Sequence, residues 1–206
     1  QLQYAGQNLW PGYQISRSVR LRSSASAYFN RTPASASNQK TWTWSGWVKR
    51  GNISAMQTIF GAFDSSTSNF VDFGLYTPGS SVPAFWCRRY NNGAGTNTWV
   101  MESTSLYRDL SAWYHVVFHL NCTSSPTFRA WINGVELTAW TQNTPPTNSN
   151  WEVNGTNAHY IGRNPSAANQ YYDGYLTEIN FIDGQALEPS YFGVTSAATG
   201  VWGPIK

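Results

Sequence analysis

Residues 111–137 read SAWYHVVFHLNCTSSPTFRAWINGVEL, and this stretch decides the fold. Two sets of side chains alternate along residues 113–120: Tyr114, Val116, Phe118 and Leu120 on one face, and Trp113, His115, Val117 and His119 on the other. This period of two predicts a β-strand. A second strand is predicted at 128–132, followed by Asn133-Gly134, two residues that tolerate the positive φ of a tight turn. The stretch therefore predicts an antiparallel hairpin.

Short strands with turn signals between them recur through the rest of the chain. The predicted strands are 19–22, 28–30, 41–49, 58–63, 70–76, 84–90, 98–101, 113–120, 128–132, 135–137, 159–161 and 175–182. In 41–49, Trp42, Trp44 and Val48 share one face, while the other face is polar except for Trp47. An antiparallel sheet with one solvated side has this pattern. No amphipathic helix of useful length is visible, although 186–192 suits one helical turn. The fold class is therefore all-β, a two-sheet antiparallel β-sandwich or jelly roll.

The composition narrows the functional classes. The chain has 206 residues, of which 16% are aromatic and 11% charged. The aromatic residues suffice for a large core, and the scarcity of charge is typical of proteins outside the cytoplasm or within a large assembly. The net charge of +3 is too small and scattered to predict nucleic-acid binding. No run of eighteen apolar residues exists, so no membrane span is predicted.

The ends of the chain differ from its middle. Residues 1–16 show little periodicity and are predicted to form an extended N-terminal arm, with Leu9 and Trp10 as anchors on a neighbouring subunit. The sandwich domain is predicted at 17–193, and the turn-like composition of 194–206 predicts a C-terminal tail. Because the chain begins at Gln1, we expect either a processed protein or a fragment of a longer one.

Eight blocks in order resemble the laminin-G-like, concanavalin A-like jelly-roll superfamily, in its laminin-G/pentraxin form. They lie within residues 18–193, at 19–22 with 27–29, 42–49, 58–61, 113–117, 130–136, 160–163, 172–179 and 186–187. Each block alone is a weak signal, and the resemblance rests on the eight occurring in order. The resemblance implies a concanavalin-A-like jelly roll.

A narrower set of segments is similar to a group of tailed-bacteriophage virion proteins that carry this domain. These segments are 13–20, 30–36, 41–51, 173–187, 191–193 and 199–202. The resemblance implies a non-enzymatic structural protein on the virion surface, as a capsid decoration, fibre or tail component. Its partners would be other virion proteins and copies of itself, with a trimer expected by analogy, and its sandwich would face host-surface glycans. A carbohydrate-binding or adhesion module of a secreted or cell-surface protein stays open as the alternative.

A glycoside hydrolase is the third alternative. Laminarinase-like enzymes on this jelly roll carry a Glu-x-Asp-x-x-Glu strand whose two carboxylates act as nucleophile and acid. The nearest match begins at Glu178, but it has Asn180 in the middle and the shorter Asp183 at its end. We therefore predict that the chain is not an enzyme. No Gly-x-Ser-x-Gly elbow supports a hydrolase triad either.

No metal or other cofactor is predicted. His115 and His119 share a strand face about 13 Å apart at a rise of ~3.4 Å per residue, which is too far for one metal. His115 matches the His of the superfamily's Trp-x-His motif, and this resemblance implies a hydrogen-bonded structural role for it. Asp64, Asn69 and Asp72 are compatible with calcium, but no loop concentrates acids as such a site requires. Cys87 and Cys122 are expected to be free thiols, with a single disulfide as the alternative.

Four aromatic residues are the candidates for glycan binding or for a protein interface. Trp140, Trp151, Tyr171 and Tyr172 lie in segments rich in Asn, Gln and Ser. Aromatic rings that stack on sugars, beside side chains that bond hydroxyl groups, suit glycan recognition, and Tyr and Trp are equally enriched at protein interfaces. Packing of these segments on the sandwich is a third interpretation of the same composition.

Overall fold

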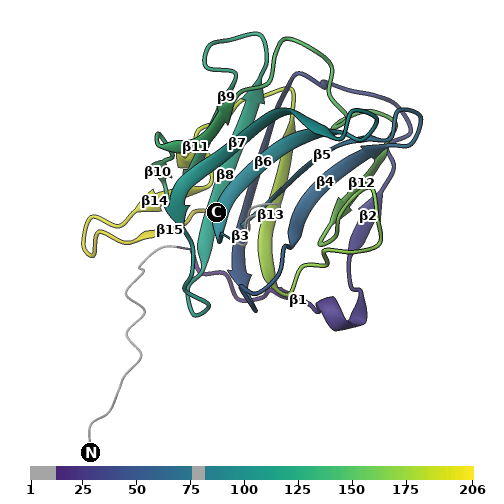
Figure 1. Cartoon of the computed structure of the whole chain (residues 1–206). Helices are drawn as coiled ribbons and strands as arrows, with labels where there is room; N and C mark the ends of the chain where they lie inside the picture. The colour runs from purple at the N-terminus through teal and green to yellow at the C-terminus, as the bar shows by residue number, and fades with distance from the viewer. Residues whose placement is uncertain (1–12, 76–81) are drawn as a thin grey trace, which may run out of the picture.

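The computed structural model describes residues 13–75 and 82–206. Its elements are almost all strands, arranged in two large sheets and one small hairpin (Figure 1). The predicted arm anchors Leu9 and Trp10 lie outside the described residues. Within the described ranges, no helix has the length and apolar character needed to cross a membrane.

The first sheet has six antiparallel strands. In spatial order they are β1 (Val19–Leu21), β13 (Gly174–Asp183), β3 (Thr41–Arg50), β8 (Tyr114–Asn121), β9 (Phe128–Ile132) and β10 (Val135–Glu136). The predicted hairpin forms its β8–β9–β10 half. Asn133 and Gly134 have φ angles of 51° and 77°, which confirms the expected turn.

The second sheet has seven antiparallel strands. In spatial order they are β11 (Trp140–Thr144), β7 (Thr96–Leu106), β6 (Ala84–Asn91), β5 (Asn69–Gly74), β4 (Thr58–Asp64), β12 (Ala158–Ile161) and β2 (Phe29–Arg31). The two sheets face one another and confirm the predicted jelly-roll sandwich. Strand β11 was not predicted, because its segment is polar and pairs only at the sheet edge with β7.

Aromatic rings fill the space between the sheets. Trp44 of β3 is fully buried, and its ring centroid lies 4.6 Å from that of Phe73 on β5. Phe118 of β8 contacts the same Phe73 ring at 4.7 Å. Edge-to-face pairs such as these stabilise a core beyond the burial of their area. The alternation along β3 and β8 therefore identified the inner face correctly.

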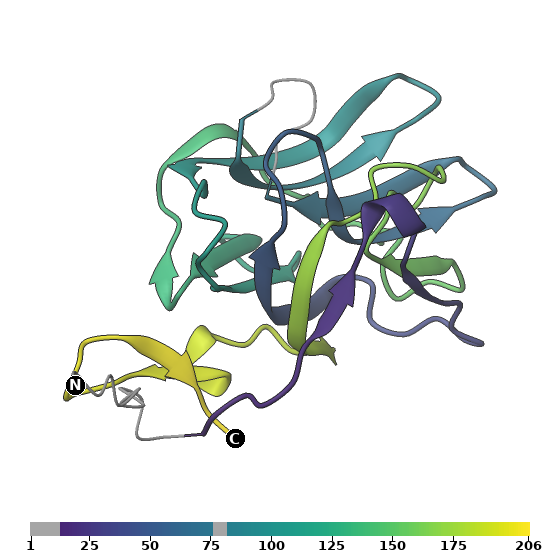
Figure 2. The same ribbon diagram turned by 90° about the horizontal axis from the view of Figure 1, so that it is seen from below.

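The chain after β13 runs across the outer face of the six-stranded sheet. It contains a 3₁₀ turn, η2 (Pro189–Tyr191), and a hairpin of β14 (Gly193–Thr195) with β15 (Trp202–Pro204). Figure 2 shows this yellow segment outside the two sheets, beside the purple N-terminal segment. The residues expected to form a turn-like tail therefore include a paired hairpin. The other 3₁₀ turn, η1 (Ser23–Ala25), joins β1 to β2.

Candidate functional site

His115 lies at the centre of the outer face of the six-stranded sheet. Its ring stacks on Trp47 with centroids 4.8 Å apart, and the Trp202 indole N–H donates to Nδ1 at 3.0 Å. Because an indole nitrogen can only donate, Nδ1 must be the unprotonated nitrogen. The proton therefore sits on Nε2, which lies 3.0 Å from Ser45 Oγ and donates to it. Burial favours this neutral ring and lowers the pKa of His115 to about 4.

Two glycines hold the Trp202 ring in place. A Cβ on Gly134, in the β9–β10 turn, would collide with the six-membered ring of Trp202. A Cβ on Gly193, in the neighbouring strand β14, would collide with it as well. Glycine at 134 thus serves two purposes, since it also adopts a positive φ. The indole is consequently clamped between the sheet turn and its own hairpin.

Polar contacts fasten the segment between β13 and the hairpin to the same face. Thr43 Oγ1 donates to the Gln185 carbonyl at 2.7 Å and accepts from the Leu187 amide at 2.8 Å. The His119 ring bonds the Leu187 carbonyl through Nδ1 at 3.1 Å. His115 therefore has the hydrogen-bonded structural role expected of it, and the structure gives His119 such a role as well.

An ion-pair network continues this attachment toward β10. Arg129 of β9 contacts Glu136 through two nitrogens, at 2.8 Å each, and also contacts Glu188 of the C-terminal segment. All three side chains are partly exposed, so the network contributes modestly to stability. It nevertheless fixes where the segment crosses the sheet.

The start of the described chain crosses the face next to the hairpin. Tyr13 Oη donates to Glu178 Oε1 at 2.8 Å, and Thr177 Oγ1 donates to the Arg17 carbonyl at 2.7 Å. A bulge in β13 at Glu178, whose φ is 47°, makes this contact possible by interrupting the ladder between Thr177 and Asn180.

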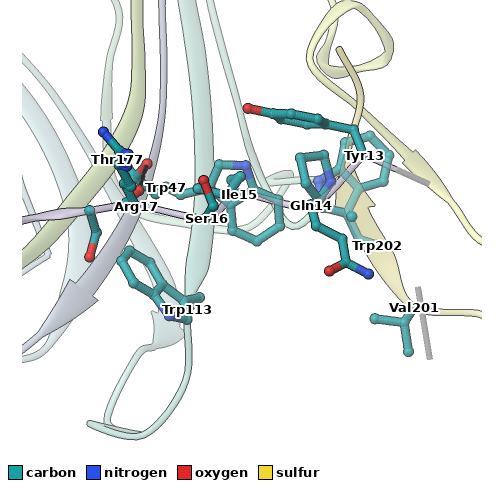
Figure 3. Close-up of a pocket in the computed structure, with 13 residues that line it drawn as sticks. Tyr13, Gln14, Ile15, Ser16, Arg17, Trp47, Trp113, Thr177, Val201 and Trp202 are labelled. Atoms are coloured by element: carbon teal, nitrogen blue, oxygen red, sulfur yellow. Dashed lines mark hydrogen bonds between the residues drawn. The ribbon is translucent and has the colours of Figure 1, made fainter. Parts of the chain in front are cut away.

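A groove of about 590 Å³ opens between these two terminal segments. Its lining includes the indoles of Trp47, Trp113 and Trp202, with Ile15 and Val201 adding apolar surface (Figure 3). Ser16, Ser18, Arg17, Gln14 and Thr177 supply the polar part of the lining. An aromatic groove with a few polar groups is the usual form of a small-ligand site.

The three tryptophans of this groove were not among the site residues predicted from the sequence. Trp47 carried a signal, because it was the one apolar residue on an otherwise polar strand face. Trp202 lies in a segment that was expected to form a tail. Only the folded chain brings it beside Trp47, 155 positions earlier in the sequence.

The structure places the four predicted aromatic residues elsewhere. Trp151 and Tyr172 are 6% and 1% exposed, and Tyr172 Oη donates to the Lys49 carbonyl at 2.8 Å. Trp140 packs against the core rings of Phe85 and Phe128. The rings of Trp151 and Tyr172 therefore pack within the sandwich, whereas Trp140 packs against the core and stays partly exposed. Tyr171 is partly exposed and lines a different cavity, at the rim of the sandwich.

The carboxylates weighed for catalysis have partners in other segments. Glu178 accepts from Tyr13, and Asp183 accepts from Asn154 Nδ2 at 2.8 Å and from the Asn38 amide at 3.1 Å. The middle position, Asn180, bonds the Glu178 carbonyl. The two carboxylates therefore join distant segments of the fold, whereas Asn180 bonds within β13.

The side chains weighed for metal binding are likewise engaged. Asp64 accepts from the Ser66 amide and from both neighbouring hydroxyls in its turn, and Asp72 pairs with Arg88 at 3.0 Å. No group of three His, Cys, Asp or Glu side chains suited to a metal occurs in the part of the chain that the structure describes. Cys87 and Cys122 are buried free thiols with no disulfide between them, which confirms the expectation.

A family model described as the concanavalin A-like lectin/glucanases superfamily matches residues 23–190, which is most of the chain. No curated protein matches the chain in sequence.

Several solved structures share the fold at low sequence identity. The SAP-like pentraxin from Limulus polyphemus superposes with a TM-score of 0.52 and 15% identity, covering 86% of this chain and 75% of the pentraxin. The LG4-5 domains of the mouse laminin α1 chain give 0.57 and 13%, covering 87% of this chain and 44% of theirs. The CBM40 module of the Ruminococcus gnavus IT-sialidase, solved with α2,3 sialyllactose, gives 0.54 and 8%, covering 85% and 94%. At these identities the likeness shows the fold alone.

Proposed function

Because this chain belongs to the concanavalin A-like lectin/glucanases superfamily, we propose that it is a non-enzymatic recognition module that binds glycans outside the cytoplasm. The observation that carries the proposal is the groove on the outer face of the six-stranded sheet. There Trp47, Trp113 and Trp202, from three distant parts of the chain, line one open cavity.

The chemistry of the groove supports sugar binding. A sugar ring has an apolar C–H face that packs on an indole, and hydroxyl groups that need hydrogen-bond partners. Trp113 supplies a partly exposed ring, and Ser16 and Thr177 supply hydroxyl groups beside it. The sialidase CBM40 module, which shares this fold and was solved bound to α2,3 sialyllactose, supports the proposal that a domain of this fold binds sugars.

Glycan-array screening followed by titration calorimetry tests the proposal. We expect neutral oligosaccharides to bind, and Trp113→Ala to weaken the best of them by roughly tenfold, because a lost stacking ring costs about 1.5 kcal/mol. Leu106→Ala is the control, since Leu106 is an exposed apolar side chain on the seven-stranded sheet. Failure of the array to detect any neutral ligand, or equal affinity of the Trp113→Ala variant, would contradict the groove assignment. Steady release of reducing ends from a bound glycan would contradict the non-enzymatic part.

A second candidate function is a structural role on the surface of a bacteriophage virion, together with other virion proteins and further copies of this chain. The observation that favours it is the fastening of residues 13–18 along the groove, through Tyr13 and Arg17. This arrangement presents an apolar surface beside the predicted arm, where a neighbouring subunit could pack.

Light scattering and cryo-electron microscopy of particles test this second candidate. We expect a trimer in solution and density for this chain in symmetric copies on the particle. A monomer at high concentration that is absent from purified particles would leave the adhesion module as the better account.

A further inference from the structure

Arg163 is held in an unusual position at the edge of the seven-stranded sheet. It follows β12, and its guanidinium carbon lies 4.4 Å from the ring centroid of Tyr160 and 5.0 Å from that of Tyr28. Its Nε donates to the Asn164 carbonyl at 3.0 Å. Two ring contacts and one hydrogen bond therefore fix the plane of the guanidinium before any ligand arrives.

The two terminal nitrogens of Arg163 are left without an acidic partner. Four arginines, Arg20, Arg88, Arg89 and Arg129, form ion pairs with carboxylates in residues 13–75 and 82–206, and Arg163 is not one of them. Its only hydrogen bond within those ranges uses Nε. The remaining donors form the fork that binds a carboxylate through two parallel hydrogen bonds.

The surroundings of Arg163 are basic. The first 63 residues contain seven Lys and Arg residues and no Asp or Glu. Two of these cations lie on the segments that contact β12 and the residues after it: Arg31 of β2 is opposite His159, and Arg22 follows Leu21, whose side chain lies against Gly162. The acid that follows the neighbouring loop, Asp173, is paired with Arg20 at 2.8 Å. A local excess of positive charge attracts an anionic ligand.

An aromatic and amide surface continues from the arginine. The ring of Tyr171 lies 6.2 Å from that of Tyr28 and lines a rim cavity of about 580 Å³. Asn52, Asn169 and Gln170 line the same cavity. Gln170 Oε1 accepts from Asn164 Nδ2 at 2.8 Å, so this amide is already oriented. Tyr28, at 40% exposed, and the partly exposed Tyr171 offer ring surface beside the fork.

We propose that Arg163, Tyr28, Tyr160 and Tyr171 form a second binding site, which takes the carboxylate of an acidic sugar such as a sialic or uronic acid. The guanidinium fork binds the carboxylate, a tyrosine ring packs on the C–H face of the sugar, and the amides of the rim cavity bond hydroxyl groups. The inference rests on the proposed recognition function but not on the groove, since Tyr160 and Tyr28 belong to the opposite sheet and its edge.

Titration of matched ligand pairs tests the site. The probes are N-acetylneuraminic acid and oligogalacturonate, each compared with its carboxyl-reduced counterpart, together with a sulfated oligosaccharide. We expect the carboxylate forms to bind roughly tenfold or more tightly than the reduced forms, because a hydrogen-bonded charge contributes about 1.5–3 kcal/mol. Equal binding of the reduced forms would overturn the proposal. If the sulfated oligosaccharide bound as tightly as the carboxylate probes, the surface would be a non-selective anion patch, and the proposal would also be overturned.

Variants separate this site from the groove and from a structural role for Arg163. Arg163→Gln should lose the preference for the carboxylate, and Arg163→Lys should keep part of it because the charge remains without the fork. Arg108→Gln is the matched control, because Arg108 is exposed in the segment after β7 and takes no part in the proposed site. Binding of neutral glycans should be unchanged in Arg163→Gln, and acidic sugars should still bind Trp113→Ala.

A folded Arg163→Gln variant that keeps the preference for the carboxylate form would overturn the proposal. Should Arg163→Gln fail to fold, Tyr171→Ala takes its place in the same comparison: we expect it to lose acidic-sugar binding, and full retention would overturn the proposal.

Discussion

His115 couples the stability of the fold to pH. Its pKa of about 4 in the folded protein lies below the ordinary value of 6.5, because the ring is buried and its Nδ1 accepts from Trp202. Above pH 6.5 the ring is neutral in both states. As pH falls from 6.5 toward 4, the unfolded chain takes up a proton that the folded chain does not, so the free energy of unfolding decreases.

Urea unfolding between pH 7.5 and 4 measures this coupling. We expect His115 to account for a slope of about 1.4 kcal/mol per pH unit, or about 3 kcal/mol over the whole window. The slope of the free energy of unfolding against pH should be smaller by that amount in His115→Gln. Part of the slope that is left comes from His119 and His159, because burial also lowers their pKa values. An identical slope in the variant would contradict the assignment of a buried neutral ring.

Gly134 is predicted to be intolerant of any side chain. Its φ of 77° disfavours an L-residue, and a Cβ there would collide with Trp202. Gly134→Ala should therefore incur the conformational cost of about 1 kcal/mol and, in addition, lose the packing of the indole. Gly200→Ala is the matched control, because Gly200 has a φ of 69° and open space around its Cβ position.

Thermal unfolding and Trp fluorescence distinguish these two glycine variants. We expect the larger loss of stability, and a shift toward solvent-exposed indole emission, in Gly134→Ala alone. Equal losses of stability in the two variants would mean that the backbone conformation alone causes the loss and that the contact with Trp202 adds nothing.

At the scale of elements, the C-terminal hairpin acts as a wall of the groove and a cover for β3 and β8. The inner faces of those strands build the core without it, since the core rings come from the two large sheets. Removal of residues 193–206 should leave the far-ultraviolet spectrum β-rich, lower the melting temperature and abolish binding of neutral glycans. The pKa of His115 should rise toward its ordinary value, because the ring loses both its cover and the Trp202 donor.

Nuclear magnetic resonance titration of the His115 ring checks the truncation, and Arg163-dependent binding of acidic sugars provides its internal control. If neutral glycans still bound the truncated chain with full affinity, the groove would not be their site.

The alternation of apolar and polar side chains predicted the strands whose two faces differ. In β3 and β8 the alternation of side chains identified the strands, their inner faces and the turn that follows β9. It failed for β11, whose residues after Trp140 are all polar, and for the β14–β15 hairpin, whose strands are three residues each. Such segments become strands because a neighbouring strand offers hydrogen-bond partners. The sequence of the segment alone does not predict which strand that is.

At the scale of the whole molecule, the aromatic core joins the two sheets. Trp44 of the six-stranded sheet is fully buried against Phe73 of the seven-stranded sheet. Trp44→Ala should destabilise the protein by about 3–5 kcal/mol, as expected for loss of a large buried ring. Chemical denaturation of this variant beside Trp113→Ala tests the difference, because Trp113 is partly exposed at the groove and should cost much less. Similar losses in the two variants would show that the groove ring has a structural role as well.

The sequence by itself determined the fold class, the turn at Asn133-Gly134 and the inner faces of the long strands. Each of these follows from local rules: alternation along a strand, and the backbone freedom of two adjacent residues. The sequence also showed Trp47 as an apolar residue on a polar face, without saying what covers it.

Which aromatic rings line the groove depends on the folded chain. Trp151 and Tyr172 were predicted from loop composition, yet the fold buries them, whereas Trp202 joins Trp47 and Trp113 at the groove. Likewise, Arg163 stacks on Tyr28 because β2 pairs with β12 across more than 100 residues. The physical reason is that exposure and contact depend on strand pairing between distant segments, which a local pattern of side chains does not encode.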